Sequence, residues 1–214
     1  MIISPGRAFI FVHIPKTGGT SMAQALEARA HRDDILIGDT EKALRRKNRV
    51  KKLAPQAAGR LWKHSTLADI RGVVSPDDMD RMLCFCLVRN PWDRMVSYYH
   101  WLQEQEFDHQ AVSLAKTLDF GAFVTHTHTG GTMRAWPYAR YMQDGSGTER
   151  GLFFRLEHLE EDWTPLVDRL GFSPEMPHIN RSERGEYREY YTAELRDLIG
   201  DLCAEDVARF GYTF

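Results

Sequence analysis

Residues 7–30 read RAFIFVHIPKTGGTSMAQALEARA and carry the strongest structural signal in the chain. Arg7–His13 combines β-branched and aromatic residues, which predicts a short strand. A proline and the pair Gly18-Gly19 interrupt this pattern, and from Thr20 onward the Ala- and Leu-rich sequence favours a helix. The stretch is therefore expected to form a strand, a tight loop and a helix.

A similar unit is predicted near the middle of the chain. The apolar run MLCFCLV at 82–88 is typical of a strand that is buried on both faces, as in a parallel sheet. Asn90-Pro91-Trp92-Asp93 follows it, and the capping Asn and the Pro at the first helical position predict a helix that runs to about Gln103. Ser75-Pro76-Asp77-Asp78 begins a shorter helix in the same way.

The alternation of strands and helices gives the fold class. The remaining candidate elements are strands at Ile35–Gly38 and Gly151–Arg155, an amphipathic helix at 157–170 that Gly171 stops, and a last helix from about Thr192. This pattern predicts a single α/β domain over residues 1–214, with a P-loop-like central parallel sheet and helices on both faces. Residues 104–150 show no clear pattern.

The composition excludes several classes of protein. The chain has 214 residues with 28 Lys or Arg and 30 Asp or Glu, and its net charge of −2 lacks the basic excess expected of a general nucleic-acid-binding protein. The apolar run at 82–88 is far shorter than the roughly 20 residues that span a bilayer, and the N-terminus does not resemble a signal peptide. The chain has three cysteines, Cys84, Cys86 and Cys203, which is an odd number. We interpret them as core residues of a protein in a reducing compartment. The protein is therefore expected to be cytoplasmic, without a membrane span.

The near-neutral total conceals a basic segment. Residues 42–63 contain nine Lys or Arg and no acidic residue. One interpretation is a solvated helix face. The other is attraction of a polyanionic acceptor such as an acidic glycan. The sequence leaves both open.

The loop HIPKTGGTS at 13–21 is the first candidate site. Glycines let the backbone turn with its N–H groups inward, and the start of a helix adds positive potential, so together they can cradle an anion. Lys16 adds a mobile charge, and Thr20 and Ser21 add hydroxyl groups. A nucleoside-triphosphate loop places its lysine after the glycines, whereas Lys16 precedes Gly18-Gly19. The alternative is an ordinary turn.

The second candidate site follows the apolar strand at 82–88. Magnesium-dependent P-loop enzymes typically place an Asp at such a strand end, whereas this chain places Arg89 there, a residue suited to phosphate. Ser97 lies two helical turns further on, roughly 10 Å away, so both residues could clasp one phosphate. The alternative is that Arg89 pairs with Asp93 and Ser97 bonds its own backbone. Two anion sites at one sheet edge predict a ligand with two separated anionic groups and no metal.

Taken together, HIPKTGGTS at 13–21 and LVRNPWDRMVSYY at 87–99 resemble the PAPS-dependent sulfotransferases, in particular the branch with carbohydrate O-sulfotransferases (PAPS is 3′-phosphoadenosine 5′-phosphosulfate). RLEHLEEDW at 155–163 and NRSERGEYREYYTAEL at 180–195 are also similar to that family. The resemblance implies three sets of nucleotide contacts. They are Lys16, Thr17, Gly18, Gly19, Thr20 and Ser21 for the 5′-phosphosulfate, Arg89 and Ser97 for the 3′-phosphate, and Arg181 and Ser182 from the last of these stretches.

The implied reaction moves a sulfuryl group from PAPS to an acceptor hydroxyl, on a carbohydrate by resemblance, and leaves adenosine 3′,5′-bisphosphate (PAP). Lys16 would stabilise the leaving bisphosphate. His64 lies where several relatives keep a catalytic histidine and would be the general base; the alternative is a structural or exposed histidine beside Lys63. His13 is interpreted as support for the loop.

Several alternatives stay open at this point. The acceptor could be an anionic glycan or a small metabolite. The rival activities are a P-loop kinase for a small molecule or nucleotide, and a nucleotide-binding module without turnover. His126 and His128 lack a third ligand of suitable spacing for zinc. A polar loop that binds the acceptor is an alternative there, and an ordinary exposed loop is the preferred interpretation.

Overall fold

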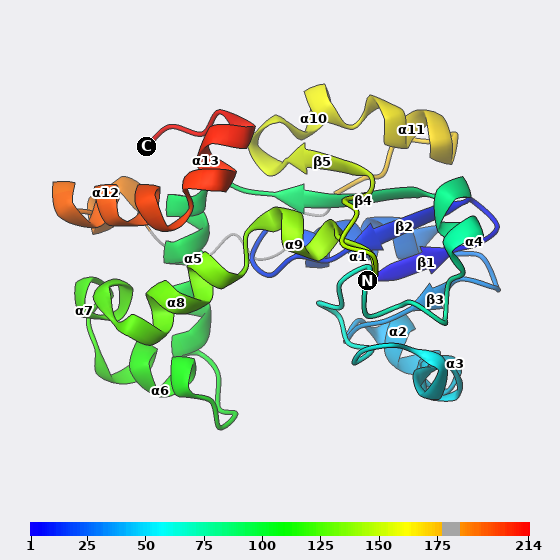
Figure 1. The fold of residues 1–214 in the computed structure, drawn as a ribbon, viewed down its shortest axis with the longest axis horizontal. Helices are drawn as coiled ribbons and strands as arrows, with labels where there is room; N and C mark the ends of the chain where they lie inside the picture. The colour runs from blue at the N-terminus through cyan, green and yellow to red at the C-terminus, as the bar shows by residue number, and fades with distance from the viewer. Residues whose placement is uncertain (177–184) are drawn as a thin grey trace. The chain divides into compact units, whose positions relative to one another are not determined.

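The computed structural model describes residues 1–176 and 185–214, which form two compact units (Figure 1). Residues 1–88 and 138–176 belong to the first unit, and residues 89–137 and 185–214 belong to the second. Arg181 and Ser182 lie outside the described residues.

The first unit is built on a five-stranded sheet in the order β3-β1-β2-β4-β5. Its strands are β1 (Ile2–Ser4), β2 (Phe9–Val12), β3 (Ile35–Leu36), β4 (Leu83–Val88) and β5 (Leu152–Arg155). The predicted parallel core is confirmed for β2, β4 and β5, which pair in parallel. β1 was not predicted, and it pairs antiparallel with both of its neighbours, so the sheet is mixed.

The antiparallel β1 aligns the rest of the sheet. Because β1 runs opposite to both β2 and β3, those two strands run in the same direction. β2, β3, β4 and β5 therefore all end at one edge of the sheet. In open α/β sheets this carboxyl edge is where ligands bind. The loop at 13–18 leaves the sheet at this edge.

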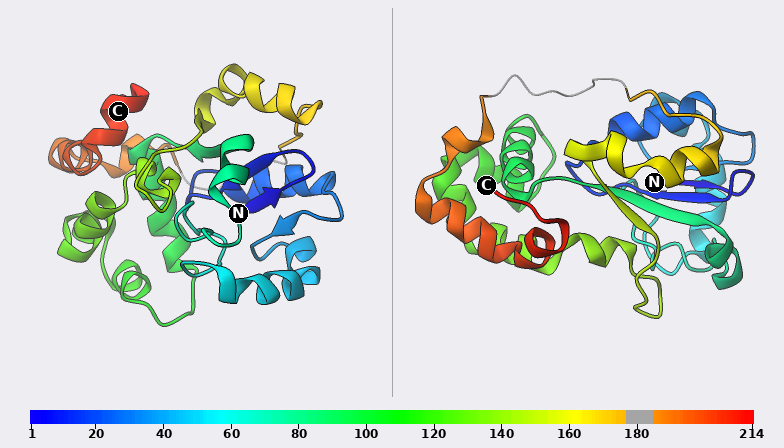
Figure 2. Two further views of the ribbon diagram at one scale, coloured as in Figure 1. Left: turned by 45° about the vertical axis from the view of Figure 1, so that its right-hand side comes forward. Right: turned by 90° about the horizontal axis from the view of Figure 1, so that it is seen from above.

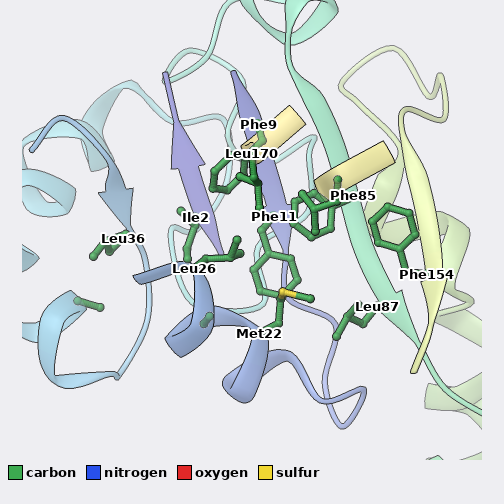
Figure 3. Close-up of a cluster of buried hydrophobic side chains, with 13 residues drawn as sticks. Ile2, Phe9, Phe11, Met22, Leu26, Leu36, Phe85, Leu87, Phe154 and Leu170 are labelled. Carbon is green, nitrogen blue, oxygen red and sulfur yellow. The ribbon is translucent and has the colours of Figure 1, made fainter. Parts of the chain in front are cut away.

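Helices cover both faces of the sheet, as expected. The first face packs against α1 (Gly19–Ala28) and α11 (Thr164–Leu170), and the buried side chains there include Phe11, Met22 and Phe85 (Figure 3). α9 (Tyr138–Met142) packs on the other face, against β4. The right-hand view of Figure 2 shows α1 in blue and α11 in yellow on one side of the sheet.

The other short helices of the first unit lie in its connections. They are α2 (Glu41–Arg45), α3 (Lys47–Leu53), η1 (Ala54–Gln56), α4 (Pro76–Arg81), η2 (Leu156–His158) and α10 (Leu159–Asp162). The Ser75 hydroxyl caps α4 by accepting from the Asp78 N–H, as predicted. The single helix expected over 157–170 is instead divided into η2, α10 and α11. The break between α10 and α11 falls just before Pro165, which cannot continue a preceding helix and lies in the first turn of α11. Gly171 ends α11 in the left-handed region, as expected.

The described part of the second unit is helical. Its helices are α5 (Pro91–Gln103), α6 (Gln110–Thr117), α7 (Phe120–Thr125), α8 (Thr127–Ala135), η3 (Tyr187–Tyr190), α12 (Ala193–Leu202) and α13 (Ala204–Phe210). α5 packs against α6, α7 and α12. The Asn90 side chain caps α5 by accepting from the N–H groups of Trp92 and Asp93, which confirms the predicted start of this helix.

Residues 104–150, which gave no pattern in the sequence, contain α6, α7, α8 and α9. Two of these helices begin at histidine rings, because His109 accepts from the Ala111 N–H and His126 accepts from the His128 N–H. His126 therefore serves as a helix cap. Within residues 1–176 and 185–214, no helix combines the length and the apolar character needed to cross a bilayer.

Candidate active site

The loop between β2 and α1 is held in a strained conformation. The Thr17 hydroxyl donates to the Ile14 carbonyl at 3.0 Å, and this buried bond closes the turn. Lys16 has φ 66° and Gly18 has φ 80°, both in the left-handed region. Glycine adopts this region without penalty, whereas a residue such as lysine pays roughly 1–2 kcal/mol. Backbone strain of this kind gathers at functional sites.

Close packing leaves no room for a side chain at Gly18 or Gly19. A Cβ atom on Gly19 would lie 2.0 Å from Cδ2 of the His13 ring. One on Gly18 would lie 2.8 Å from Cδ1 of Leu156. The His13 ring and Leu156 therefore pack directly against the backbone of the loop that follows β2.

The start of α1 faces this loop without a side-chain cap. α1 has ten residues and begins at Gly19, and its N-cap residue Gly18 makes no side-chain hydrogen bond to the first N–H groups. Uncapped N–H groups and the helix dipole together favour an anion. Lys16 and Thr20 are partly exposed beside them, while Ser21 is buried.

His64 is the sequence-predicted residue that the fold brings to this loop. Its Nδ1 donates to the backbone carbonyl of His13 at 2.7 Å, across a separation of 51 positions. The centroids of the two imidazole rings are 4.7 Å apart. Because a carbonyl oxygen only accepts, Nδ1 carries the proton and the neutral ring has its lone pair on Nε2.

Burial keeps both histidines neutral at pH 7. Desolvation lowers the pKa of His64 to about 4, and the hydrogen bond to His13 opposes this shift only in part. The pKa of His13 is also lowered well below its usual value of 6.5, again mainly by burial. The His13 ring packs against Phe11 and beneath Gly19. His13 thus supports the loop, and His64 is present as a neutral imidazole.

Polar groups from α1 and from the end of β3 border the loop. A small pocket there has the following lining residues: Met1, His13, Thr20, Ala23, Glu27, Ile37, Gly38, Asp39, Thr40 and Lys63. The Glu27 carboxylate accepts from the Thr40 hydroxyl at 2.7 and 2.8 Å, and its pKa is raised because it is desolvated. Lys63 pairs with Asp39 at 2.6 Å. Lys63 is therefore paired with the segment that follows β3.

Arg89 is the first residue of the second unit and directly follows Val88, the last residue of β4. Its guanidinium contacts one oxygen of Asp93, with Nε at 2.7 Å and a terminal nitrogen at 2.6 Å. The pairing that was the alternative interpretation of Arg89 is therefore present. This pair uses two of the five N–H groups of the guanidinium. Arg89, Asp93 and Ser97 are spaced by four, so they follow one face of the helix.

Two residues near His64 were not singled out from the sequence. The Trp62 ring lies 4.9 Å from the His64 ring and is 42% exposed. The Arg60 guanidinium lies 5.3 Å from the centroid of that indole. Their closeness to His64 in the sequence could have marked Arg60 and Trp62 as candidate site residues. The sequence does not show that the Trp62 ring is exposed.

The residues described here offer no cluster of three or more His, Cys, Asp or Glu side chains placed to hold a metal. Arg89, which follows β4, and the glycine loop, which follows β2, instead offer hydrogen-bond donors for anions. A sheet whose strands end at an uncapped helix start and a glycine loop is typical of enzymes that bind phosphorylated nucleotides.

Comparison with known proteins identifies the family. The model of the sulfotransferase family matches residues 1–213, so the chain belongs to the sulfotransferase family. It is therefore a PAPS-dependent sulfotransferase, as the motifs predicted. A crystal structure of mouse sulfotransferase SULT7A1 complexed with PAP is similar, with a TM-score of 0.53 and 15% identity. That match covers 96% of this chain and 85% of the mouse chain, and it shows a shared fold. A search of curated proteins finds no match.

Proposed function

We propose that the protein transfers the sulfuryl group of PAPS to a hydroxyl of a carbohydrate, with His64 as the general base. The observation that carries this proposal is the hydrogen bond from His64 to the His13 carbonyl. It attaches the candidate base to the first residue of the anion loop and leaves Nε2 as the proton acceptor. The base and the donor site are then parts of one packed structure.

The 5′-phosphosulfate is proposed to bind the loop and the start of α1. Lys16, Gly18, Gly19, Thr20 and Ser21 would supply charge, N–H groups and hydroxyls. The Thr17 hydroxyl is buried and bonded to Ile14, so we assign Thr17 a contact through its backbone N–H. The uncapped helix start supports this assignment.

The 3′-phosphate is proposed to bind Arg89 and Ser97. The register of the sheet supports this, because Val12, the last residue of β2, pairs in parallel with Cys86, two residues before the end of β4. The anion loop follows β2, and Arg89 follows β4. Arg181 and Ser182 are proposed as further nucleotide contacts on the family resemblance alone.

The proposed reaction is an in-line transfer. The acceptor oxygen forms a bond to sulfur while the bond from sulfur to the 5′-phosphate oxygen breaks, and Nε2 of His64 takes the hydroxyl proton. Lys16 and the loop N–H groups offset the charge on the departing bisphosphate. A pKa of about 4 makes free His64 a weak base. The negative charge of bound PAPS would raise this pKa toward the range useful for catalysis.

The acceptor is proposed to be an anionic carbohydrate. The basic segment supports this, because α3 buries none of its residues and exposes Lys47, Lys51 and Lys52. Other basic residues of the segment are occupied, since Arg45 pairs with Glu41 and Lys63 pairs with Asp39. The exposed lysines of α3 would attract an acidic chain toward the site.

We also propose that residues 1–214 act as one sulfotransferase domain. The family match supports this, because it runs through both compact units of the chain.

A thermal-shift panel of PAP, AMP, ADP and ATP, each with and without magnesium, tests the donor site. If the protein binds both the 5′- and the 3′-phosphate, PAP should stabilise its folded state more than the other nucleotides do. The expected gain in the free energy of unfolding is about 2.7 kcal/mol at a PAP concentration of 100 times Kd. Stronger stabilisation by ATP with magnesium would favour a kinase. PAP binding without PAPS-dependent turnover on any acceptor would favour a binding module.

A further inference from the structure

The segment next to His64 presents an exposed tryptophan. Trp62 is 42% exposed, and its ring lies nearly perpendicular to the His64 ring, at 88°. Arg60 places its guanidinium 5.3 Å from the indole centroid. We call Arg60 and Trp62 the Arg–Trp stack. Both residues belong to the first unit, as do His64 and the anion loop.

A buried serine holds this segment in a fixed turn. The Ser65 side chain is fully buried, and its hydroxyl lies 2.8 Å from both the Arg60 and the Trp62 carbonyl oxygens. The same hydroxyl accepts from the Trp62 N–H at 2.9 Å. The backbone of the Arg–Trp stack is thus fixed by one residue that packs into the core.

A second anchor fixes the two ends of the turn. The Gly59 N–H donates to the Asp69 carbonyl at 3.0 Å, and the Thr66 N–H donates to the Asp69 carboxylate at 2.7 Å. A Cβ on Gly59 would lie 1.9 Å from that carboxylate. The turn is therefore closed tightly, and it keeps an indole in contact with water. Removal of such an apolar ring from water would be favourable in free energy, so a ligand that covers the indole would gain affinity.

The geometry points to an acceptor subsite at the Arg–Trp stack. We propose that Trp62 packs against the ring of an anionic sugar and that Arg60 pairs with the carboxylate or sulfate of that sugar. A rigid, amphipathic ring supplies contact area at little cost in conformational entropy, and a guanidinium suits planar anions. Because Trp62 touches His64, the bound sugar would present a hydroxyl to Nε2. This inference rests on the proposed function and specifies its acceptor.

The charge of the surroundings favours an anionic over a neutral sugar. Arg60 lies in the basic segment 42–63 that includes the exposed lysines of α3, and no acidic residue interrupts that segment. A cation stacked on an indole keeps its charge available to a ligand while its position is restricted. Trp62 would thus provide affinity for the ring, and Arg60 would provide selectivity for the anion.

The test measures binding of two oligosaccharides to the protein saturated with PAP, by calorimetry. The probes are unsulfated chondroitin hexasaccharide, which carries carboxylates, and maltohexaose, which is neutral. The variants are Trp62→Ala, Trp62→Phe and Arg60→Gln. Arg45→Gln removes a charge elsewhere in the basic segment and is the matched control, since Arg45 pairs with Glu41 on the exposed face of α2.

We expect Trp62→Ala to weaken chondroitin binding at least tenfold, and Trp62→Phe to recover most of the loss. Arg60→Gln should weaken chondroitin binding and leave maltohexaose binding unchanged, while Arg45→Gln changes neither by more than twofold. PAP affinity should stay within twofold in all variants. A wild-type protein that binds PAP but neither oligosaccharide, or equal chondroitin binding by wild type and Trp62→Ala, overturns the subsite. Absence of PAP binding by the wild type would instead overturn the proposed function.

Discussion

His64 donates its Nδ1–H to the backbone carbonyl of His13 at 2.7 Å, and the two residues are 51 positions apart in the chain. This bond sets the tautomer of one histidine by means of the backbone of the other. It also places an unprotonated Nε2 on a residue attached to the anion loop. The relationship therefore links the support of the loop to the proposed proton transfer.

His64→Asn separates these two roles. An asparagine amide can donate the same hydrogen bond to the His13 carbonyl, but it has no basic nitrogen. We expect turnover of PAPS with an acceptor to fall about 10²- to 10⁴-fold, the contribution typical of a general base, while PAP affinity stays the same. Steady-state kinetics and calorimetry measure the two quantities. A parallel loss of PAP affinity would make His64 a support of the loop instead.

The pH dependence of stability should also report His64. Its pKa is about 4 in the folded protein and near 6.5 when exposed, so the unfolded chain binds more protons between these values. The free energy of unfolding therefore falls as pH drops from 6.5 to 4, by about 3 kcal/mol at 1.36 kcal/mol per pH unit. Urea unfolding of wild type and His64→Asn across this range measures the difference. The variant should show a shallower decline, and identical slopes would contradict the assignment.

Local signals were sufficient to predict the elements that carry the candidate site. The strand before the loop, the start of α1 and the Asn90 cap of α5 all follow from residues that act within a few positions of themselves. β1 escaped prediction because a strand of three residues is defined by its pairing with β2 and β3. Helices α6 and α8 escaped because histidine rings cap them in place of the usual small polar residues.

The sequence predicted the residue types of the site but not the contacts between them. His64 was a candidate base from its position, yet its bond to His13 depends on packing across 51 positions. Gly19 was predicted to bend the backbone, whereas the structure also requires it for the close approach of the His13 ring. The turn that carries the exposed Trp62 is held by the buried hydroxyl of Ser65, and the burial of that serine depends on packing that the sequence does not show.

Gly19→Ala should disrupt the loop through one contact. The new methyl group would lie 2.0 Å from the buried His13 ring, and overpacking of this kind typically costs 1–3 kcal/mol. Urea unfolding should show this loss, and PAP binding should weaken. Gly131→Ala is the matched control, because a Cβ there meets no atom within 4 Å. It lies inside α8 and should be neutral or stabilising by up to about 1 kcal/mol.

The double variant His13→Ala/Gly19→Ala identifies the cause of that loss. Removing the imidazole makes room for the methyl group, so the two effects should not add. We expect the double variant to be more stable than the sum of the single effects predicts, by about 1–3 kcal/mol. Additive losses would show that Gly19 is needed for a reason other than the His13 ring.

Arg89→Gln should weaken binding of a nucleotide only through its 3′-phosphate. Hydrogen bonds from a charged group contribute about 1.5–3 kcal/mol, so PAP affinity should fall roughly 10- to 150-fold while AMP affinity stays the same. Calorimetry with the two nucleotides measures both. Arg81→Gln is the control, because Arg81 pairs with Asp78 on α4 much as Arg89 pairs with Asp93 on α5. Equal losses for PAP and AMP would contradict a 3′-phosphate contact.

Lys16→Asn should raise the stability of the protein and lower its activity. Lys16 has φ 66°, a left-handed conformation that asparagine tolerates better than lysine. We therefore expect the free energy of unfolding to rise by up to about 1 kcal/mol, a part of the roughly 1–2 kcal/mol strain of that conformation. Loss of the charge that offsets the departing bisphosphate should lower turnover about 10²- to 10³-fold. Urea unfolding and steady-state kinetics measure the two effects. If stability and turnover fell together, Lys16 would be a structural residue of the loop, because a strained residue kept for function is the one whose removal should stabilise the fold.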